Sequence, residues 1–136
     1  MKYFLAKSEP AVYSIGDLER DRRTTWDGVR NPQALQAVRA MQPGDRVFIY
    51  HSTGESAVVG LASVADVPRP DPKDPKLTVV DLEFVLKLPE PVTLAEVKQS
   101  ERFADWSLVR QSRLSTMACP EAFVAWIRGK YPKLKI

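Results

Sequence analysis

The segment from Val80 to Leu88 places the strongest constraint on what this chain folds into. Its apolar residues, Val80, Leu82, Phe84, Leu86 and Leu88, alternate with the charged residues Asp81, Glu83 and Lys87. Successive side chains of a strand point to opposite faces, so this period of two predicts a strand with one face buried and the other exposed. Such a strand is stable only when others pair with it, and we therefore expect a sheet.

Three further predicted strands span residues 3–7, 46–51 and 57–67, with turns rich in proline and glycine between the elements. The stretch from Pro68 to Pro75 contains four prolines, and each of them lacks a backbone donor. Because helix and sheet both need those donors, we expect this stretch to form a loop.

Several helices have recognisable start signals. The signals are Ser14 as an N-cap, Asn31 and Pro32 as N-cap and first helical position, the capping box from Thr93 to Glu96, and Pro120 at the start of the last helix. Long strands in succession, with helices between and after them, predict an α+β domain built on a curved or closed sheet.

Composition predicts one globular domain. The chain has 136 residues, of which 44% are hydrophobic and 27% are charged, so residues 1–136 form a single domain with its own core. No apolar run reaches the roughly 18 residues of a membrane span, and Lys7 and Glu9 interrupt the first apolar stretch too early for a signal peptide. The single Cys119 cannot form an internal disulfide. We expect a monomer without a membrane partner, in the cytoplasm or, for a eukaryotic source, the nucleus.

Residues 24–31 concentrate groups that are suited to hold a nucleic-acid base. They include the aromatic ring of Trp26, the carboxylate of Asp27, a glycine, an arginine and the amide of Asn31. A base in a pocket is recognised by stacking on an aromatic face and by hydrogen bonds to its edge. Because Trp26 stands at a strand end before an Asp-Gly turn, we expect it to line a pocket, with a role in the core as the alternative. Trp106 and Trp126 lie in apolar helical settings typical of the core.

Three other short segments accompany residues 24–31, and they span residues 5–10, 47–52 and 109–115. In this order and spacing, the four segments resemble the EVE domain, a family of the PUA-like superfold, from about Tyr3 to Ile127. The resemblance implies a PUA-like pseudo-barrel of mostly antiparallel strands with short helices around it. It also implies a binding module that holds a modified base of DNA or RNA in a pocket.

The resemblance further implies which residues line that pocket. They are Lys7, Ser8, Glu9, Trp26, Val29, Arg30, Asn31, Tyr50, His51, Ser52, Arg113, Leu114 and Ser115. Of these, Ser8, Trp26, Ser52 and Ser115 should face one cavity. Three basic residues near the segments, Arg22, Arg23 and Arg110, are candidate phosphate contacts, although such residues are often only solvated surface. The net charge of +3 is compatible with nucleic acid and is weak support for it.

Some of these residues have a second interpretation. Asn31 suits an N-cap before Pro32, which leaves its amide fewer hydrogen bonds for a ligand. Arg113 suits a phosphate, or alternatively an internal salt bridge with Asp27 or Glu9. The Lys7 to Glu9 segment also reads as a plain transition from strand to loop.

Two other functions compete with the binding module. The first is a small hydrolase that acts on a modified nucleoside, as in PUA-like relatives of the ASCH type, with Cys119 and His51 as the only nucleophile–base pair. The second is a small-molecule-binding domain that uses the same pocket. We expect neither a cofactor nor a metal, since His51 is the only histidine and no other ligand stands at zinc spacing from it.

Overall fold

The computed structural model describes residues 1–136 and contains one sheet with five short helices around it. The strands are β1 (Tyr3–Ser8), β2 (Arg23–Trp26), β3 (Arg46–His51), β4 (Ala57–Val64), β5 (Arg69–Asp71), β6 (Asp74–Thr93) and β7 (Thr116–Ala118). The helices are α1 (Ile15–Asp21), α2 (Pro32–Ala40), α3 (Leu94–Gln99), α4 (Ser107–Arg110) and α5 (Glu121–Lys130). No helix is both long enough and apolar enough to cross a membrane.

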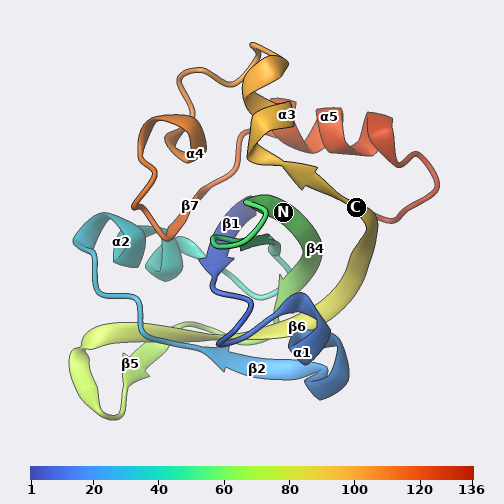
Figure 1. Cartoon of the computed structure of the whole chain (residues 1–136). Helices are drawn as coiled ribbons and strands as arrows, with labels where there is room; N and C mark the ends of the chain where they lie inside the picture. The colour runs from blue at the N-terminus through green and yellow to red at the C-terminus, as the bar shows by residue number, and fades with distance from the viewer.

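The sheet has the strand order β2-β6-β4-β3-β1-β7, and β5 pairs with β6 outside this path. Only β1 and β3 run parallel, and every other pair is antiparallel. The strands curl around a common interior, and the helices lie around the outside (Figure 1). The predicted α+β class with a curved, mostly antiparallel sheet is confirmed.

Strand β6 is the longest strand of the sheet, and it pairs with β2, β4 and β5 along its 20 residues. The predicted alternation holds at its centre, where Val80 and Leu82 are buried and Glu83 is exposed. Its register against β4 shifts at two places. Such irregularities bend a strand and increase its twist, so one long strand serves partners on different sides of the barrel.

The prediction of a loop from Pro68 to Pro75 was wrong. Within it, β5 pairs with β6 in a short hairpin that places Arg69 opposite Val79 and Pro70 opposite Thr78. Since β5 has a partner on one side only, the missing donor of a proline is tolerated there. Prolines exclude a central strand, and here they mark an edge strand. The predicted strand 57–67 also ends earlier, at Val64.

The helix start signals are confirmed, with one difference. The Ser14 hydroxyl accepts a hydrogen bond from the backbone N–H of Asp17 at 3.1 Å, and the Asp17 carboxylate accepts one from the Ser14 N–H at 2.9 Å. At α3, Thr93 caps the backbone of Glu96 in the expected way. The Glu96 carboxylate pairs with Lys130 of α5. The second capping box is therefore half formed, and its glutamate joins α3 to α5.

The core fills the barrel and continues under α5. Phe48 and Phe123 are fully buried, and their rings meet edge to face at 5.5 Å between centroids. Trp106 and Trp126 extend this aromatic cluster, in agreement with the core role predicted for them. The Trp106 indole N–H donates to the backbone oxygen of Ala118 at 3.0 Å, so its polar group is satisfied.

Gly60 of β4 allows the first helix to approach the sheet. A Cβ at this position would lie 2.5 Å from Cδ1 of Ile15 and 2.8 Å from the backbone oxygen of Leu86. We expect Gly60→Ala to lower the free energy of unfolding by about 1–3 kcal/mol, because the crowded atoms must shift. Gly129→Ala, in the open on α5, should instead raise it by about 0.5–1 kcal/mol. Urea unfolding of both variants measures this, and equal effects would contradict the close packing of Ile15.

Candidate functional site

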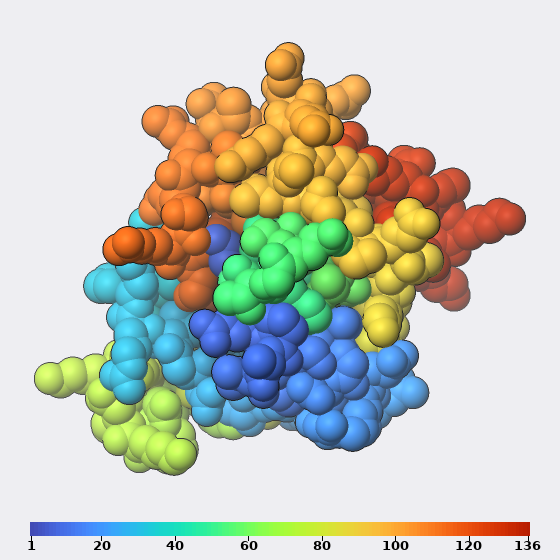
Figure 2. Space-filling view, in the orientation of Figure 1, coloured from blue at the N-terminus to red at the C-terminus, as the bar shows by residue number.

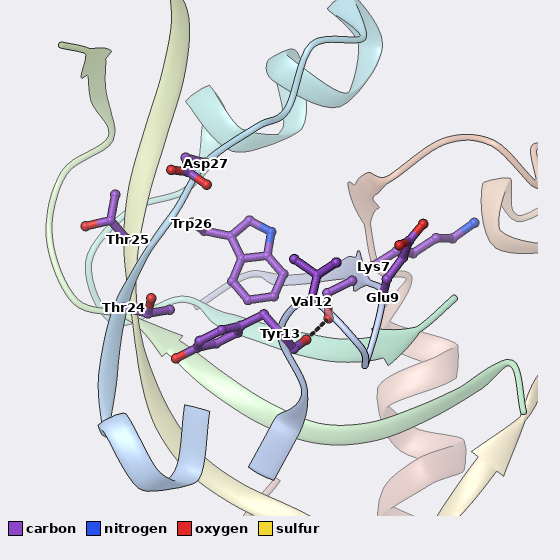
Figure 3. Close-up of a pocket in the computed structure, with 9 residues that line it drawn as sticks. Lys7, Glu9, Val12, Tyr13, Thr24, Thr25, Trp26 and Asp27 are labelled. Atoms are coloured by element: carbon purple, nitrogen blue, oxygen red, sulfur yellow. Dashed lines mark hydrogen bonds between the residues drawn. The ribbon is translucent and has the colours of Figure 1, made fainter. Parts of the chain in front are cut away.

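A cavity of about 420 Å³ opens between the end of β1 and strand β2. Its lining comes from the end of β1, the turn after it and β2, and consists of Lys7, Ser8, Glu9, Val12, Tyr13, Thr24, Thr25, Trp26 and Asp27 (Figure 3). Residues far apart in the sequence surround this region. In the space-filling view, the dark-blue surface of the chain after β1 adjoins the green turn that follows β3, and orange segments lie nearby (Figure 2). The cavity thus opens where several of the four predicted segments converge.

Trp26 forms one wall of the cavity. Strand β2 alternates between exposed and half-buried residues, which places Thr24 and Trp26 on its inner face. The indole contacts the core and also lines the cavity, so the two interpretations of Trp26 both apply. The ring of Tyr13 stands nearly perpendicular to it, at 85° and 6.2 Å between centroids. Two aromatic rings from different elements therefore form one corner (Figure 3).

The turn between β1 and α1 supplies the second wall, and sequence reasoning missed it. The backbone N–H groups of Val12 and Tyr13 both donate to the Glu9 oxygen at 2.9 Å, and the Ser8 hydroxyl donates to the Tyr13 oxygen at 2.8 Å. The Tyr13 hydroxyl donates to Asp21 of α1 at 2.9 Å. One signal in the sequence could have shown this. Tyr13 directly precedes Ser14, the N-cap of α1, and only four residues separate it from Ser8 at the end of β1.

The segments around residues 52 and 115 hold the end of β1 in place. Both the N–H and the hydroxyl of Ser52 donate to the Ser8 oxygen, at 2.9 and 3.3 Å. On the other side of β1, the Lys7 N–H donates to the Ser115 oxygen at 2.8 Å. Of the four residues expected to face one cavity, Ser8 and Trp26 line it, whereas Ser52 and Ser115 do not. They support the strand end that does.

Other predicted pocket residues are not part of the cavity lining. Three of them belong to the core, and these are Val29, Tyr50 and Leu114. Arg30 and Asn31 are exposed at the start of α2. The Asn31 side-chain oxygen accepts hydrogen bonds from the next helical N–H groups at 2.8 and 3.2 Å, so its capping role is confirmed. Only its NH₂ group remains for a ligand.

The charged groups at the rim are of both signs. Lys7 donates to the Ser112 backbone oxygen at 3.0 Å, its ammonium lies 5.5 Å from the centre of the Tyr50 ring, and burial lowers its pKa. Glu9 and Asp27 are exposed and form no salt bridge. Arg113 is also without an ion pair, so the alternative of an internal salt bridge with either carboxylate was wrong.

The three candidate phosphate contacts already have contacts within the protein. Arg23 pairs with Asp81 at 3.1 Å, and the more exposed pair of Arg110 with Asp105 is wider, at 3.6 Å. The Arg22 guanidinium lies 5.4 Å from the centre of the Phe84 ring. All three arginines are exposed. A role for them at phosphates remains a prediction.

Contacts of Asp81 with β2 hold in place the strand that carries Trp26. The Asp81 carboxylate accepts a hydrogen bond from Thr25 at 2.8 Å and pairs with Arg23 of β2 and Arg69 of β5. The hydrogen bond from Thr25 is the main cause of a pKa below the usual value for this carboxyl, and the two arginines lower it further. A charged Asp81 thus ties three strands together on their outer face.

Cys119 and His51 do not form a catalytic pair. Cys119 follows β7 and bonds through its N–H to Tyr3 at the start of β1, whereas His51 pairs with Ser8 at the end of that strand. The length of β1 therefore separates them, which is roughly 15 Å. The Cys119 thiol is also buried, and burial raises its pKa far above the ordinary value. It is neither accessible nor activated as a nucleophile.

His51 links β3 to the start of α1. Its Nε2 atom accepts a hydrogen bond from the Ile15 N–H at 3.1 Å, which requires a neutral ring. Burial lowers the pKa of His51, and the nearby charge of Lys87 lowers it further. The folded state thus resists protonation at a position next to the turn that carries Tyr13.

We expect acid to weaken the fold through His51. Its folded pKa lies below the unfolded value of about 6.5, so its contribution to stability is complete above that value and is lost as the pH falls through the folded pKa. His51→Gln keeps an acceptor for Ile15 but does not titrate. Urea unfolding between about pH 7 and about pH 5 should therefore show a smaller loss for the variant than for the wild type. Parallel pH profiles would contradict this role of His51.

Comparison with known proteins identifies the family. Residues 2–130 match the family model described as the EVE domain. Thymocyte nuclear protein 1 of Mus musculus is 34% identical over 124 residues, with 71% of this chain and 55% of that protein covered. The chain thus spans about half the length of the curated relatives that it matches.

Solved structures agree over the whole fold. The NMR structure of Rpa0253 from Rhodopseudomonas palustris has a TM-score of 0.91 and 36% identity, covering 100% of this chain and 97% of that one. The crystal structure of human THYN1 in complex with DNA that contains 5-methylcytosine has a TM-score of 0.88 and 26% identity, covering 98% and 99%. These neighbours also bear out the PUA-like architecture. With a family model that covers nearly the whole sequence, the chain belongs to the EVE domain family.

Proposed function

We propose that this protein binds nucleic acid and holds a modified base in the cavity between β1 and β2. The observation that carries the proposal is the aromatic corner of Trp26 and Tyr13 at the mouth of a 420 Å³ cavity. A volume of this size lies within the range of about 300–1,000 Å³ that is typical of small-ligand pockets. The human relative solved with DNA that contains 5-methylcytosine supports a modified cytosine as the first candidate.

The polar groups of the cavity suit the edge of a base better than a phosphate. The exposed carboxylates of Glu9 and Asp27 line it, and neither is neutralised by an ion pair. The third charged residue of the lining, Lys7, already donates to the Ser112 backbone oxygen. The two carboxylates repel a phosphate, but they can accept hydrogen bonds from the exocyclic amino group of a cytosine. The Ser8 hydroxyl donates its hydrogen bond to the Tyr13 backbone oxygen, so its oxygen remains as an acceptor for a ligand.

The energetics of such binding are reasonable. Extruding a base from a duplex costs a few kcal/mol, and less when the base pair is already weakened. Stacking on an aromatic residue such as Trp26 returns about 1–3 kcal/mol. Hydrogen bonds to the base edge and burial of a methyl group must supply the rest. We infer that plain nucleic acid binds with modest affinity.

The two competing functions share the same cavity. A hydrolase would have to use Glu9 or Asp27 as the general acid or base, since Cys119 and His51 are far apart. Product formation from modified nucleosides, followed by chromatography, would support that alternative. Tight binding of a free nucleoside without preference for an oligonucleotide would support the small-molecule alternative.

A binding panel tests the proposal directly. Oligonucleotides with one modified cytosine or adenine, as DNA and as RNA, are compared with plain strands of the same sequence by fluorescence anisotropy. The proposal expects at least one modified strand to bind more tightly than its plain counterpart. Equal affinity across the whole panel would overturn it.

Trp26→Ala should remove this selectivity. The loss of stacking predicts an affinity for the modified strand lower by about 10- to 100-fold, which corresponds to about 1–3 kcal/mol. Trp126→Phe is the matched control, because this second half-buried tryptophan lies in the aromatic cluster of α5 and away from the cavity. Thermal unfolding should show that the Trp26→Ala variant still folds. An unfolded variant would favour a purely structural role for Trp26.

Phosphate contacts should contribute affinity without selectivity. We expect Arg22→Gln combined with Arg110→Gln to weaken modified and plain strands alike, because contacts to phosphate carry no information about the base. With about four phosphates contacted, the slope of log K against log salt on duplex DNA should be near −3 to −4, and the double variant should reduce it by about 1 to 2. An unchanged slope would show that these arginines do not contact phosphate.

A further inference from the structure

One large apolar side chain is exposed at the mouth of the cavity. Val12 is 77% exposed, and the other two exposed large apolar side chains are Met1, at 79%, and Val67, at 62%. Of these three, only Val12 lines the cavity. It lies between the indole of Trp26 and the Lys7 to Glu9 segment (Figure 3).

The backbone holds Val12 in a defined position. Its N–H bonds to the Glu9 oxygen, and the next residue, Tyr13, is held by three hydrogen bonds to Ser8, Glu9 and Asp21. Pro10 restricts the turn further, and the capping box at Ser14 fixes its far end. The turn therefore holds an exposed branched side chain in a defined position, unlike the tip of a flexible loop.

We propose that Val12 is an apolar wedge that enters the base stack of duplex DNA beside the extruded base. This inference rests on the proposed function. Proteins that deform a duplex often insert an apolar side chain at a base step. A base extruded into the cavity leaves a gap in the duplex, and the residue at the cavity mouth is the one nearest that gap. In a single strand there is no such gap to fill.

The surroundings of Val12 favour a base as its occupant over a phosphate. The lining has three charged residues, and the ammonium of Lys7, the only cation among them, donates to the Ser112 backbone oxygen. Glu9 contributes a negative charge beside Val12, and Asp27 contributes another across the cavity. Both charges disfavour a phosphate at the mouth, whereas the uncharged faces of stacked bases meet an apolar side chain without an electrostatic penalty. Val12 therefore makes the protein discriminate between a paired and an unpaired modified strand.

The test compares a duplex that contains one 5-methylcytosine with the same modified single strand. Val12→Ser should lower the affinity for the duplex by about fivefold more than the affinity for the single strand. Val12→Leu should keep the wild-type ratio of the two affinities. Val67→Ser is the control, because it removes a similarly exposed valine that is not part of the cavity lining.

A second measurement uses the fluorescence of 2-aminopurine placed next to the modified base. At saturation, this fluorescence should be lower with Val12→Ser than with the wild type.

Each other outcome has a distinct meaning. Equal losses for duplex and single strand would make Val12 only a wall of the cavity and would overturn the wedge. No loss for either strand, or wild-type protein that binds the modified single strand but not the duplex, would overturn it as well. Wild-type protein that does not distinguish modified from plain DNA in either form would overturn the proposed function itself, and the wedge with it.

Discussion

The hydrogen bonds around the carboxyl end of β1 bring the distant parts of the site together. Because β1 lies between β3 and β7, its last residues bond to chain on both sides, with Ser52 donating to Ser8 and Lys7 donating to Ser115. The Ser8 hydroxyl then fixes the turn that carries Tyr13. All four segments of the family pattern depend on this strand end or face it. A shift of β1 by one residue would reverse which of its side chains reach the cavity.

Strand β2 contributes the other half of the site under a different constraint. It is an edge strand and has no second neighbour to hold it, so its position depends on β6 and on the Asp81 carboxylate that binds Thr25 and Arg23. An edge strand of this kind can carry Trp26 half in the core and half in the cavity. The same ring therefore contributes to the core and, in the proposed function, to recognition.

Local signals in the sequence predicted the local structure well, and tertiary pairing decided the rest. The alternation in β6 and the caps at Ser14 and Asn31 depend on neighbouring residues, and they were predicted correctly. The prolines of β5 predicted a loop, whereas they lie in an edge strand. A strand tolerates proline where it has no second partner, and the sequence does not show how many partners a strand has. Of the four segments that the family resemblance places at the pocket, only 5–10 and 24–31 line the cavity, and the roles of Ser52 and Tyr13 did not follow from the motif. Only the pairing of β1 shows that Ser52 supports the site and that Tyr13 lines it.

The distribution of charge separates two tasks in the proposed binding. Two of the three charged residues that line the cavity are the carboxylates Glu9 and Asp27, whereas exposed arginines such as Arg22 and Arg110 lie outside the lining. A polymer that binds through its phosphates alone is attracted by the arginines but gains nothing from the cavity. A base that enters the cavity leaves its phosphates outside the lining. In the proposed binding, the two carboxylates thus disfavour a phosphate in the cavity, and specificity comes from disfavouring the wrong group as well as from contacts to the right one.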